Sequence, residues 1–248
     1  MKVLLAAVLA VSLASEAGAA VKLGYGTIPG SNSFTVYNYT TNKQVNDSED
    51  FSLGVFTVGA DAMQKVTDLI SIGAEVTAGA PMGSYEFDET KTAVGIPAGF
   101  GNPNADSTAT ITAATLGAMA KVQAGLTLGP GTGTLGLGLG SIMIAAMYEG
   151  IEQNWTGATG TTKAGKNTDR GTMLVPVFVI QVTPGYKMVV GNDVELGLEI
   201  PLSLMSETDL TREQLDEPTD PDVENPAIDG MKMGGFGFGV NLVISKKI

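Results

Sequence analysis

The side chains that could do chemistry in this chain of 248 residues are mainly carboxylates, hydroxyls and lysines, because the sequence contains no cysteine and no histidine. Without thiols there is no disulfide framework, no cysteine-based metal site and no thiol nucleophile. Without imidazole there is no Ser-His-Asp triad, and the commonest general base is missing. Catalysis would therefore have to come from paired acids, which can divide the acid and base roles between them.

The best-spaced acid pair is Glu195 and Glu199, within the segment DVELGLEIPLSLM at 193–205. In a strand both side chains would lie on one face, about 13 Å apart by the strand rise. The two carboxylates of a retaining glycosidase lie only about 5 Å apart. A hydrolase that uses carboxylates is therefore the least favoured interpretation, and we predict that the chain is not an enzyme and needs no cofactor.

The most acidic segment is SETDLTREQLDEPTDPDVENPAIDG at 206–230. Oxygen-rich acids suit Ca²⁺, which makes Asp216, Asp220, Asp222 and Glu224 weak candidates for metal ligands. Their spacing is not that of an EF-hand, and the prolines between them favour an extended chain. We favour a solvated loop held open by its own charge, with no metal site.

Composition limits the classes of partner. The formal net charge of -12 argues against nucleic acid, whose phosphates would be repelled. No apolar window reaches the roughly 18 residues that a membrane helix needs. The start of the chain has Lys2, an apolar core at 3–14 and the small-x-small motif Ala17-Gly18-Ala19. This pattern predicts a signal peptide at 1–19 that is cleaved off, with an N-terminal membrane anchor as the alternative.

The elements that must position the acids and lysines are strands with a period of two. Residues 134–148 change phase after Leu139, which predicts a bulge near Gly140 and Ser141. Period-two patterning predicts eight strands, at about 21–28, 51–60, 69–80, 108–126, 134–148, 172–184, 193–204 and 231–245.

The connections between these strands alternate between long and short. In an antiparallel meander all the long connections would then lie at one end, as in a transmembrane β-barrel. The apolar strand faces would contact lipid and the polar faces would line the interior. We therefore predict one domain at 20–248, an all-β, eight-stranded antiparallel up-and-down transmembrane barrel. Its four long extracellular loops are expected at about 29–50, 81–107, 149–171 and 205–230.

Several charged side chains would point into such a barrel. Buried charges must be paired, so we favour an ion-paired plug. A narrow polar path for small solutes is the second interpretation. The apolar inner face of 172–184 also leaves open a hydrophobic ligand. The predicted interior charges are Lys22, Glu75, Lys121, Glu195 and Glu199.

A secreted or periplasmic β-sandwich that binds or adheres to a partner is the alternative fold. It also has alternating strands, whose apolar faces would pack against each other. The single tryptophan, Trp155, favours this alternative, because membrane barrels usually carry aromatic girdles. The alternating loop lengths and the scarcity of large aromatics on the apolar faces favour the barrel.

The last strand, GGFGFGVNLVIS, has a glycine, an apolar residue three positions on and another two further, at Gly239, Leu242 and Ile244. With the whole-chain architecture, this spacing resembles the small eight-stranded bacterial outer-membrane proteins of the OmpA, OmpX and OmpW type. The resemblance implies an outer-membrane location, recognition by the barrel-assembly machinery and contact with outer-membrane lipid. The chain departs from that pattern by ending in ISKKI and by lacking the usual aromatics in the signal.

Overall fold

The computed structural model of the protein describes residues 18–88, 93–94, 108–156, 162–191, 194–210 and 231–246. Within this part of the chain, no helix is long and apolar enough to cross a membrane. The described residues form β1 (Gly18–Asn38), β2 (Lys43–Lys65), β3 (Ile70–Pro81), β4 (Tyr85–Asp88), β5 (Ala93–Val94), β6 (Thr108–Leu128), β7 (Gly131–Thr156), β8 (Thr162–Val189), β9 (Val194–Glu199), β10 (Leu202–Asp209) and β11 (Met231–Lys246).

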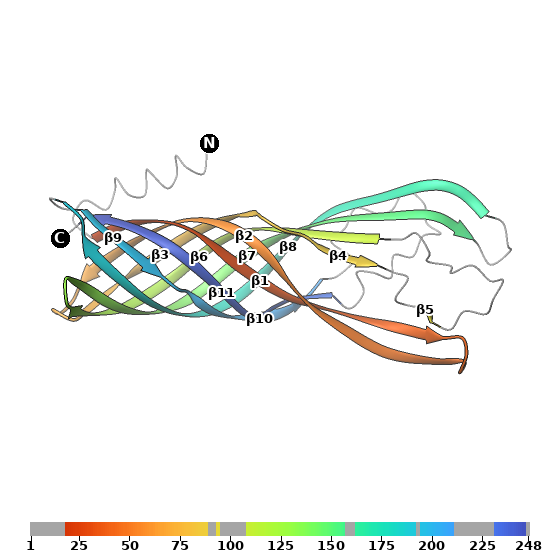
Figure 1. Ribbon diagram of the computed structural model, residues 1–248, viewed down its shortest axis with the longest axis horizontal. Helices are drawn as coiled ribbons and strands as arrows, with labels where there is room; N and C mark the ends of the chain where they lie inside the picture. The colour runs from red at the N-terminus through yellow and green to blue at the C-terminus, as the bar shows by residue number, and fades with distance from the viewer. Residues whose placement is uncertain are drawn as a thin grey trace.

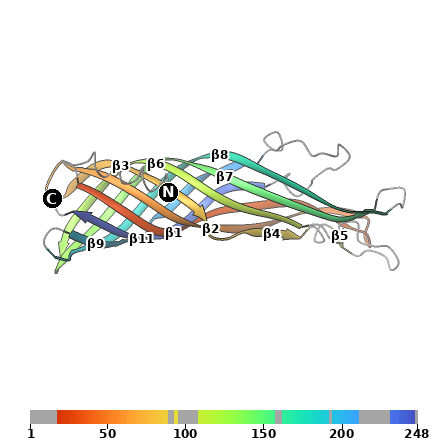
Figure 2. The ribbon, with the colours of Figure 1, turned by 90° about the horizontal axis from the view of Figure 1, so that it is seen from above.

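These strands close into one antiparallel barrel (Figures 1 and 2). β3 and β4 pair with successive segments of β6 and together occupy one strand position of the barrel, which we call a stave. β9 and β10 make another, because both lie between β8 and β11. β11 then pairs with β1 and closes the ring, while β5 adds a short parallel pairing at the far end of β1. The predicted eight-stranded antiparallel barrel is confirmed, and a single closed sheet excludes the β-sandwich.

The start of β1 and the end of β11 lie at the same end of the barrel, with the short β2–β3, β6–β7 and β8–β9 connections (Figure 1). We call the half of the barrel at this end the terminal half and the other the distal half. Two ribbons, β1–β2 and β7–β8, extend beyond the distal half (Figure 1).

The ribbons occupy much of what the sequence predicted as loop. β1 and β2 stay paired up to Asn38 and Lys43, so the predicted loop at 29–50 shrinks to a turn at 39–42. Asn38 shapes this turn by accepting hydrogen bonds from the backbone N–H of Thr40 and Thr41. β7 and β8 cover most of 149–171 in the same way. The alternation of Phe34 and Val36 with polar residues indicates the extension of β1, whereas the sequence at 149–171 has no clear alternation, because a paired ribbon needs no apolar face.

The other two predicted loops are only partly described. β4 and β5 lie within 81–107, and β10 continues to Asp209, inside 205–230. The remaining residues of both ranges lie outside the described part of the chain.

The outer face of the terminal half is apolar. From Leu116 to Leu126, strand β6 covers about 33 Å by its rise, or about 25 Å along the barrel axis at the tilt usual for membrane barrels. That is the height of a lipid-facing band. The band includes Leu23, Tyr25, Phe56, Ile72, Val76, Leu116, Val122, Leu137, Leu139, Phe178, Ile180, Leu198, Leu202, Phe238 and Leu242, all exposed in the isolated chain.

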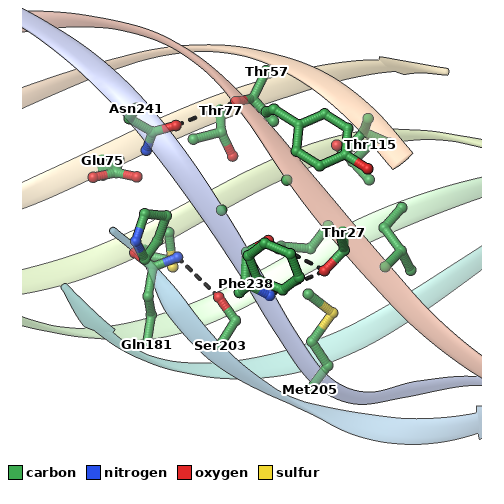
Figure 3. Close-up of a pocket in the computed structure, with 18 of the residues that line it drawn as sticks. Thr27, Thr57, Glu75, Thr77, Thr115, Gln181, Ser203, Met205, Phe238 and Asn241 are labelled. Atoms are coloured by element: carbon green, nitrogen blue, oxygen red, sulfur yellow. Dashed lines mark hydrogen bonds between the residues drawn. The ribbon is translucent and has the colours of Figure 1, made fainter. Parts of the chain in front are cut away.

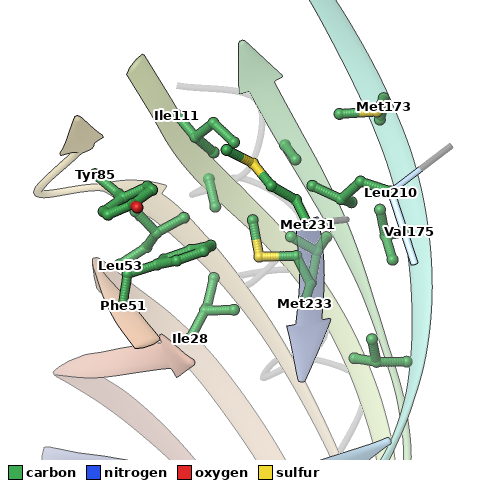
Figure 4. Close-up of a cluster of buried hydrophobic side chains, with 14 of the residues drawn as sticks. Ile28, Phe51, Leu53, Tyr85, Ile111, Met173, Val175, Leu210, Met231 and Met233 are labelled. Atoms are coloured by element: carbon green, nitrogen blue, oxygen red, sulfur yellow. The ribbon is translucent and has the colours of Figure 1, made fainter. Parts of the chain in front are cut away.

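In the distal half the polarity is inverted. Its outer face carries polar residues such as Ser52, Thr112 and Thr172. Its interior is a buried apolar cluster, which we call the distal core (Figure 4). Aromatic contacts strengthen this core, with Phe51 stacked on Tyr85 at a centroid distance of 4.2 Å. Its most completely buried members include Leu53, Phe87, Ile111, Ile144, Met173, Val177, Met231 and Met233.

The inversion explains the phase change in β7. The bulge predicted near Gly140 and Ser141 is wrong, because both residues remain in continuous register with β6 and β8. Leu139 faces outward in the terminal half, whereas Ile144 is fully buried in the distal core. The apolar residues of β7 change sides while the strand itself stays regular.

Candidate functional site

Five charged side chains meet inside the terminal half, and we call them the charged cluster. They come from five strands and are at most 4 % exposed. Lys22 lies at the centre of three carboxylates. Its Nζ is 2.9 Å from Asp61 Oδ2 and 2.8 Å from Glu199 Oε2, and it also donates a hydrogen bond to Glu75.

Lys121, on β6, contacts the same carboxylates. Its Nζ lies 3.0 Å from Glu75 Oε2 and 3.6 Å from Glu199 Oε2. Lys187 approaches Glu199 Oε1 at 3.9 Å. With Lys187 beside the charged cluster, three lysines balance its three carboxylates, which is the condition for keeping charges in a barrel interior.

Strand register brings these groups together. Asp61 on β2 lies directly opposite Glu75 on β3. Lys121 on β6 faces Gly73, so it lies diagonally from Glu75, within reach of a long side chain. Gly136 on β7 leaves room for the lysine stem, since a Cβ at Gly136 would lie only 3.0 Å from Lys121 Cε.

Four of the five predicted interior charges, Lys22, Glu75, Lys121 and Glu199, lie in the charged cluster. Glu195 does not. It lies near the terminal rim, half-buried, and accepts a hydrogen bond from Ser245 Oγ at 3.3 Å.

Asp61 and Lys187 lie outside the strands that the sequence predicts. The predicted strand ends at 60, one residue before Asp61, although the alternation of Ala60, Asp61 and Ala62 indicates that it continues. Lys187 lies beyond the predicted strand at 172–184, whereas β8 extends to Val189.

The weak metal candidates Asp216, Asp220, Asp222 and Glu224 lie outside the described residues. Within the ranges that are described, no group of three or more acids, histidines or cysteines is arranged to hold a metal ion.

A cavity of about 80 Å³ lies between the charged cluster and the distal core (Figure 3). Hydroxyl and amide groups line its walls, including Thr57, Thr77, Thr115, Ser203 and Asn241. Gln181 Nε2 donates a hydrogen bond to Ser203 Oγ at 3.1 Å across the wall. Glu75 of the charged cluster borders the cavity on one side. On the distal side, Ile28, Val55, Ile144 and Met205 belong to both the cavity lining and the distal core.

The closed ring of eight staves, with an apolar outer band and a polar interior at the same level, defines the class of the fold as an eight-stranded transmembrane-type β-barrel. This assignment rests on the strand pairing and on the distribution of polarity.

A comparison with solved structures finds matches of low sequence identity and low TM-score, three of which follow. Neisserial surface protein A is 8% identical, with a TM-score of 0.38, over 93% of this chain and 99% of that one. Ail, the attachment invasion locus protein of Yersinia pestis, is 9% identical, with a TM-score of 0.33, over 92% and 99%. The outer membrane protease OmpT of Escherichia coli is 11% identical, with a TM-score of 0.33, over 93% and 97%. No protein-family model and no curated protein sequence matches the chain.

Proposed function

We propose that the chain is an integral protein of the bacterial outer membrane, with a structural and surface-exposed role in the envelope. The observation that carries the proposal is the inversion of polarity along the barrel. In the terminal half the outer face is apolar over the height of a bilayer core, while charges lie inside. Such a surface is stable only in contact with lipid, because a band of this area exposed to water would drive aggregation.

The distal half fits the outside of the membrane. Its apolar core and polar outer face are those of a protein domain in water, and the two ribbons extend this half further. We infer that the distal half faces the cell exterior and that the termini face the periplasm, the usual arrangement of bacterial single-chain barrels.

Two partners follow from the same proposal. One is outer-membrane lipid around the apolar band. The other is the barrel-assembly machinery, through the Gly239, Leu242 and Ile244 signal of the last strand, where Leu242 and Ile244 both face outward. Removal of a signal peptide at 1–19 would precede delivery to the outer membrane. β1 begins at Gly18, next to the expected cleavage site.

The proposal gives the charged cluster a structural role as a plug. Its carboxylates are buried and engaged by lysines, so they are poorly placed to bind a substrate or to move protons in a reaction. Passage of small solutes is the second candidate function, and the cavity is the observation that favours it.

The first experiment is expression with the native start of the chain, isolation of membranes, and electrophoresis in SDS with unheated beside heated samples. A closed barrel should resist SDS until heated, so the unheated membrane fraction should run at a different mobility. Protein that is soluble in the periplasm or medium, with no mobility shift, would overturn the proposal.

A further inference from the structure

The pairing of β1 with β11 is irregular at the level of the cavity, and we call this stretch the β1–β11 seam. Gly26 pairs with Gly239, and the next pair is Gly30 with Met233, so three residues of β1 face five of β11. Across this seam, the Thr27 hydroxyl accepts a hydrogen bond from Phe238 N–H at 3.0 Å and donates one to Phe238 O at 3.2 Å (Figure 3). The Thr27 side chain thus bonds to the backbone of β11 where the regular strand pairing stops, and Pro29 packs against Gly235 and Gly237 beside it.

The cavity reaches the outer surface at this seam. Tyr25, Thr27 and Phe238 are among its lining residues. Tyr25 and Phe238 also belong to the apolar outer band, where they are 40% and 50% exposed. Along the barrel axis, the cavity is bounded by the charged cluster on one side and by the distal core on the other. The seam is therefore the shortest route from the cavity to the outside, and it opens on the face that contacts lipid.

The lining suits an uncharged guest. The lysines nearest the cavity are already paired with carboxylates, and burying a further ion without a partner would be costly. The hydroxyls of Thr77 and Thr115 have no hydrogen-bond partner among the described residues and can bind a guest. Each faces a glycine across the β3–β6 pair, Thr77 opposite Gly117 and Thr115 opposite Gly79, and the glycine leaves room for the hydroxyl, since a Cβ would lie 2.7 Å from Thr77 Oγ1 and still closer to Thr115 Oγ1. Met119, Ile144 and Met205 supply apolar contacts.

The size of the cavity limits the guest. A dry apolar cavity of about 150 Å³ holds benzene, and this one has about 80 Å³. It therefore fits a molecule of roughly three to five non-hydrogen atoms. Ligands of that size bind weakly, with a dissociation constant on the order of 1 mM.

We propose that this cavity is a binding site for small uncharged amphiphiles, such as short-chain alcohols, and that they enter from the membrane through the β1–β11 seam. The hydroxyl of the guest bonds to Thr77 and Thr115, while its alkyl part contacts Met119, Ile144 and Met205. The route through the seam rests on the membrane location proposed above, whereas the binding site itself does not.

The binding site is tested by NMR on the full chain in lipid nanodiscs with methyl-labelled methionine. Titration with 1-propanol should shift Met119 and Met205 saturably, while Met173 and Met233 in the distal core act as internal controls. Propylammonium, of the same size but charged, should cause no such shift. If Met119 and Met205 respond no more than the controls, or without saturation, the cavity holds only water and the site is refuted.

Matched variants test the assigned hydroxyls. Thr77→Val combined with Thr115→Val preserves side-chain shape and should weaken 1-propanol binding roughly tenfold, the effect of losing one to two hydrogen bonds. Thr112→Val, on the outer face of β6, should leave binding unchanged. Equal affinity in all these proteins would show that the threonines do not hold the guest.

The route is tested with Ser203→Cys, which places a single thiol in the cavity of a chain that has no other cysteine. Neutral methyl methanethiosulfonate should label it at least about tenfold faster than the charged sulfonatoethyl reagent, since only the neutral one crosses lipid. Adding Thr27→Val removes the hydrogen bonds of the seam at constant shape and should speed neutral labelling. Labelling by the charged reagent, or rates unaffected by Thr27→Val, would refute entry through the seam.

Failure of the route and failure of the membrane proposal can be told apart. The heat-dependent mobility shift reports the membrane barrel directly, so a protein that shows the shift but labels from water refutes only the seam.

Discussion

Lys22 forms the closest ion pairs of the charged cluster. Its ammonium is 2 % exposed and contacts Asp61, Glu75 and Glu199 at once. Removing one partner from such a network leaves buried charge uncompensated, which costs more than the net stabilisation that the intact network provides. The stability of the barrel should therefore depend strongly on this residue, although a well-packed apolar interior could replace the whole cluster.

Lys22→Met should reduce the free energy of unfolding by about 3–5 kcal/mol, the usual cost of breaking a buried ion pair. Lys65→Met is the control, because Lys65 is 64% exposed and forms only a surface pair with Asp68 at 3.3 Å. The control should cost less than about 1 kcal/mol. Urea-driven unfolding from lipid vesicles measures both. Similar losses for the two variants would mean that the cluster contributes no more than a surface ion pair.

At the scale of the elements, each stave is longer than a membrane strand needs. About 9–11 residues cross a bilayer, whereas β1, β6, β7 and β8 each contain more than 20. The excess length forms the distal half and the ribbons. One strand thus passes through two environments. In the terminal half its apolar side chains lie on the outer face, toward lipid. In the distal half its apolar side chains lie on the inner face, in the buried core.

A charge introduced on the outer face should locate the boundary between these environments. Leu137→Arg, in the middle of the apolar band, should destabilise the protein by about 2–4 kcal/mol in lipid. Ser52→Arg, on the polar outer face of the distal half, should change stability by less than about 0.5 kcal/mol. Unfolding in vesicles compares the two variants. Equal losses of stability for the two variants would show that no membrane boundary lies between these two positions.

The strands of the terminal half could be predicted from the sequence because a lipid face and a polar interior impose a clean period of two. Leu242 and Ile244 against Asn241 show that pattern. Where the two halves meet, this pattern is lost. In β8, Leu174 and Phe178 face outward while Val175 and Val177 are buried, so both faces are apolar and the period disappears.

The charged cluster was predictable only in part. Alternation placed Lys22, Glu75, Lys121 and Glu199 on inner faces, but alternation along a strand carries no information about height within the barrel. Only the register between strands brings Glu75 beside Lys121 and separates Glu195 from both.

At the scale of the whole molecule, the interior is closed at two levels, by the charged cluster and by the distal core. Eight strands enclose a space only just wide enough for side chains. The wild-type protein should therefore show no single-channel steps in planar lipid bilayers. A heat-modifiable preparation, verified by gel on the same sample, ensures that a folded barrel is tested. Regular conductance steps from that preparation would show that the charged cluster does not act as a plug, and would favour a narrow path for small solutes.

The position of the charged cluster also bears on the order of folding. Lys22 lies near the start of the described chain and Glu199 near its end, with β11 between their strands. Until the last strand meets the first, Lys22 keeps Asp61 and Glu75 but lacks Glu199, and Glu199 has only Lys187 on the neighbouring β8. Contacts between such distant parts of the chain form slowly, because the entropy of loop closure is lost before the contacts form. Ring closure therefore completes the neutralisation of the interior charges, which penalises an open barrel.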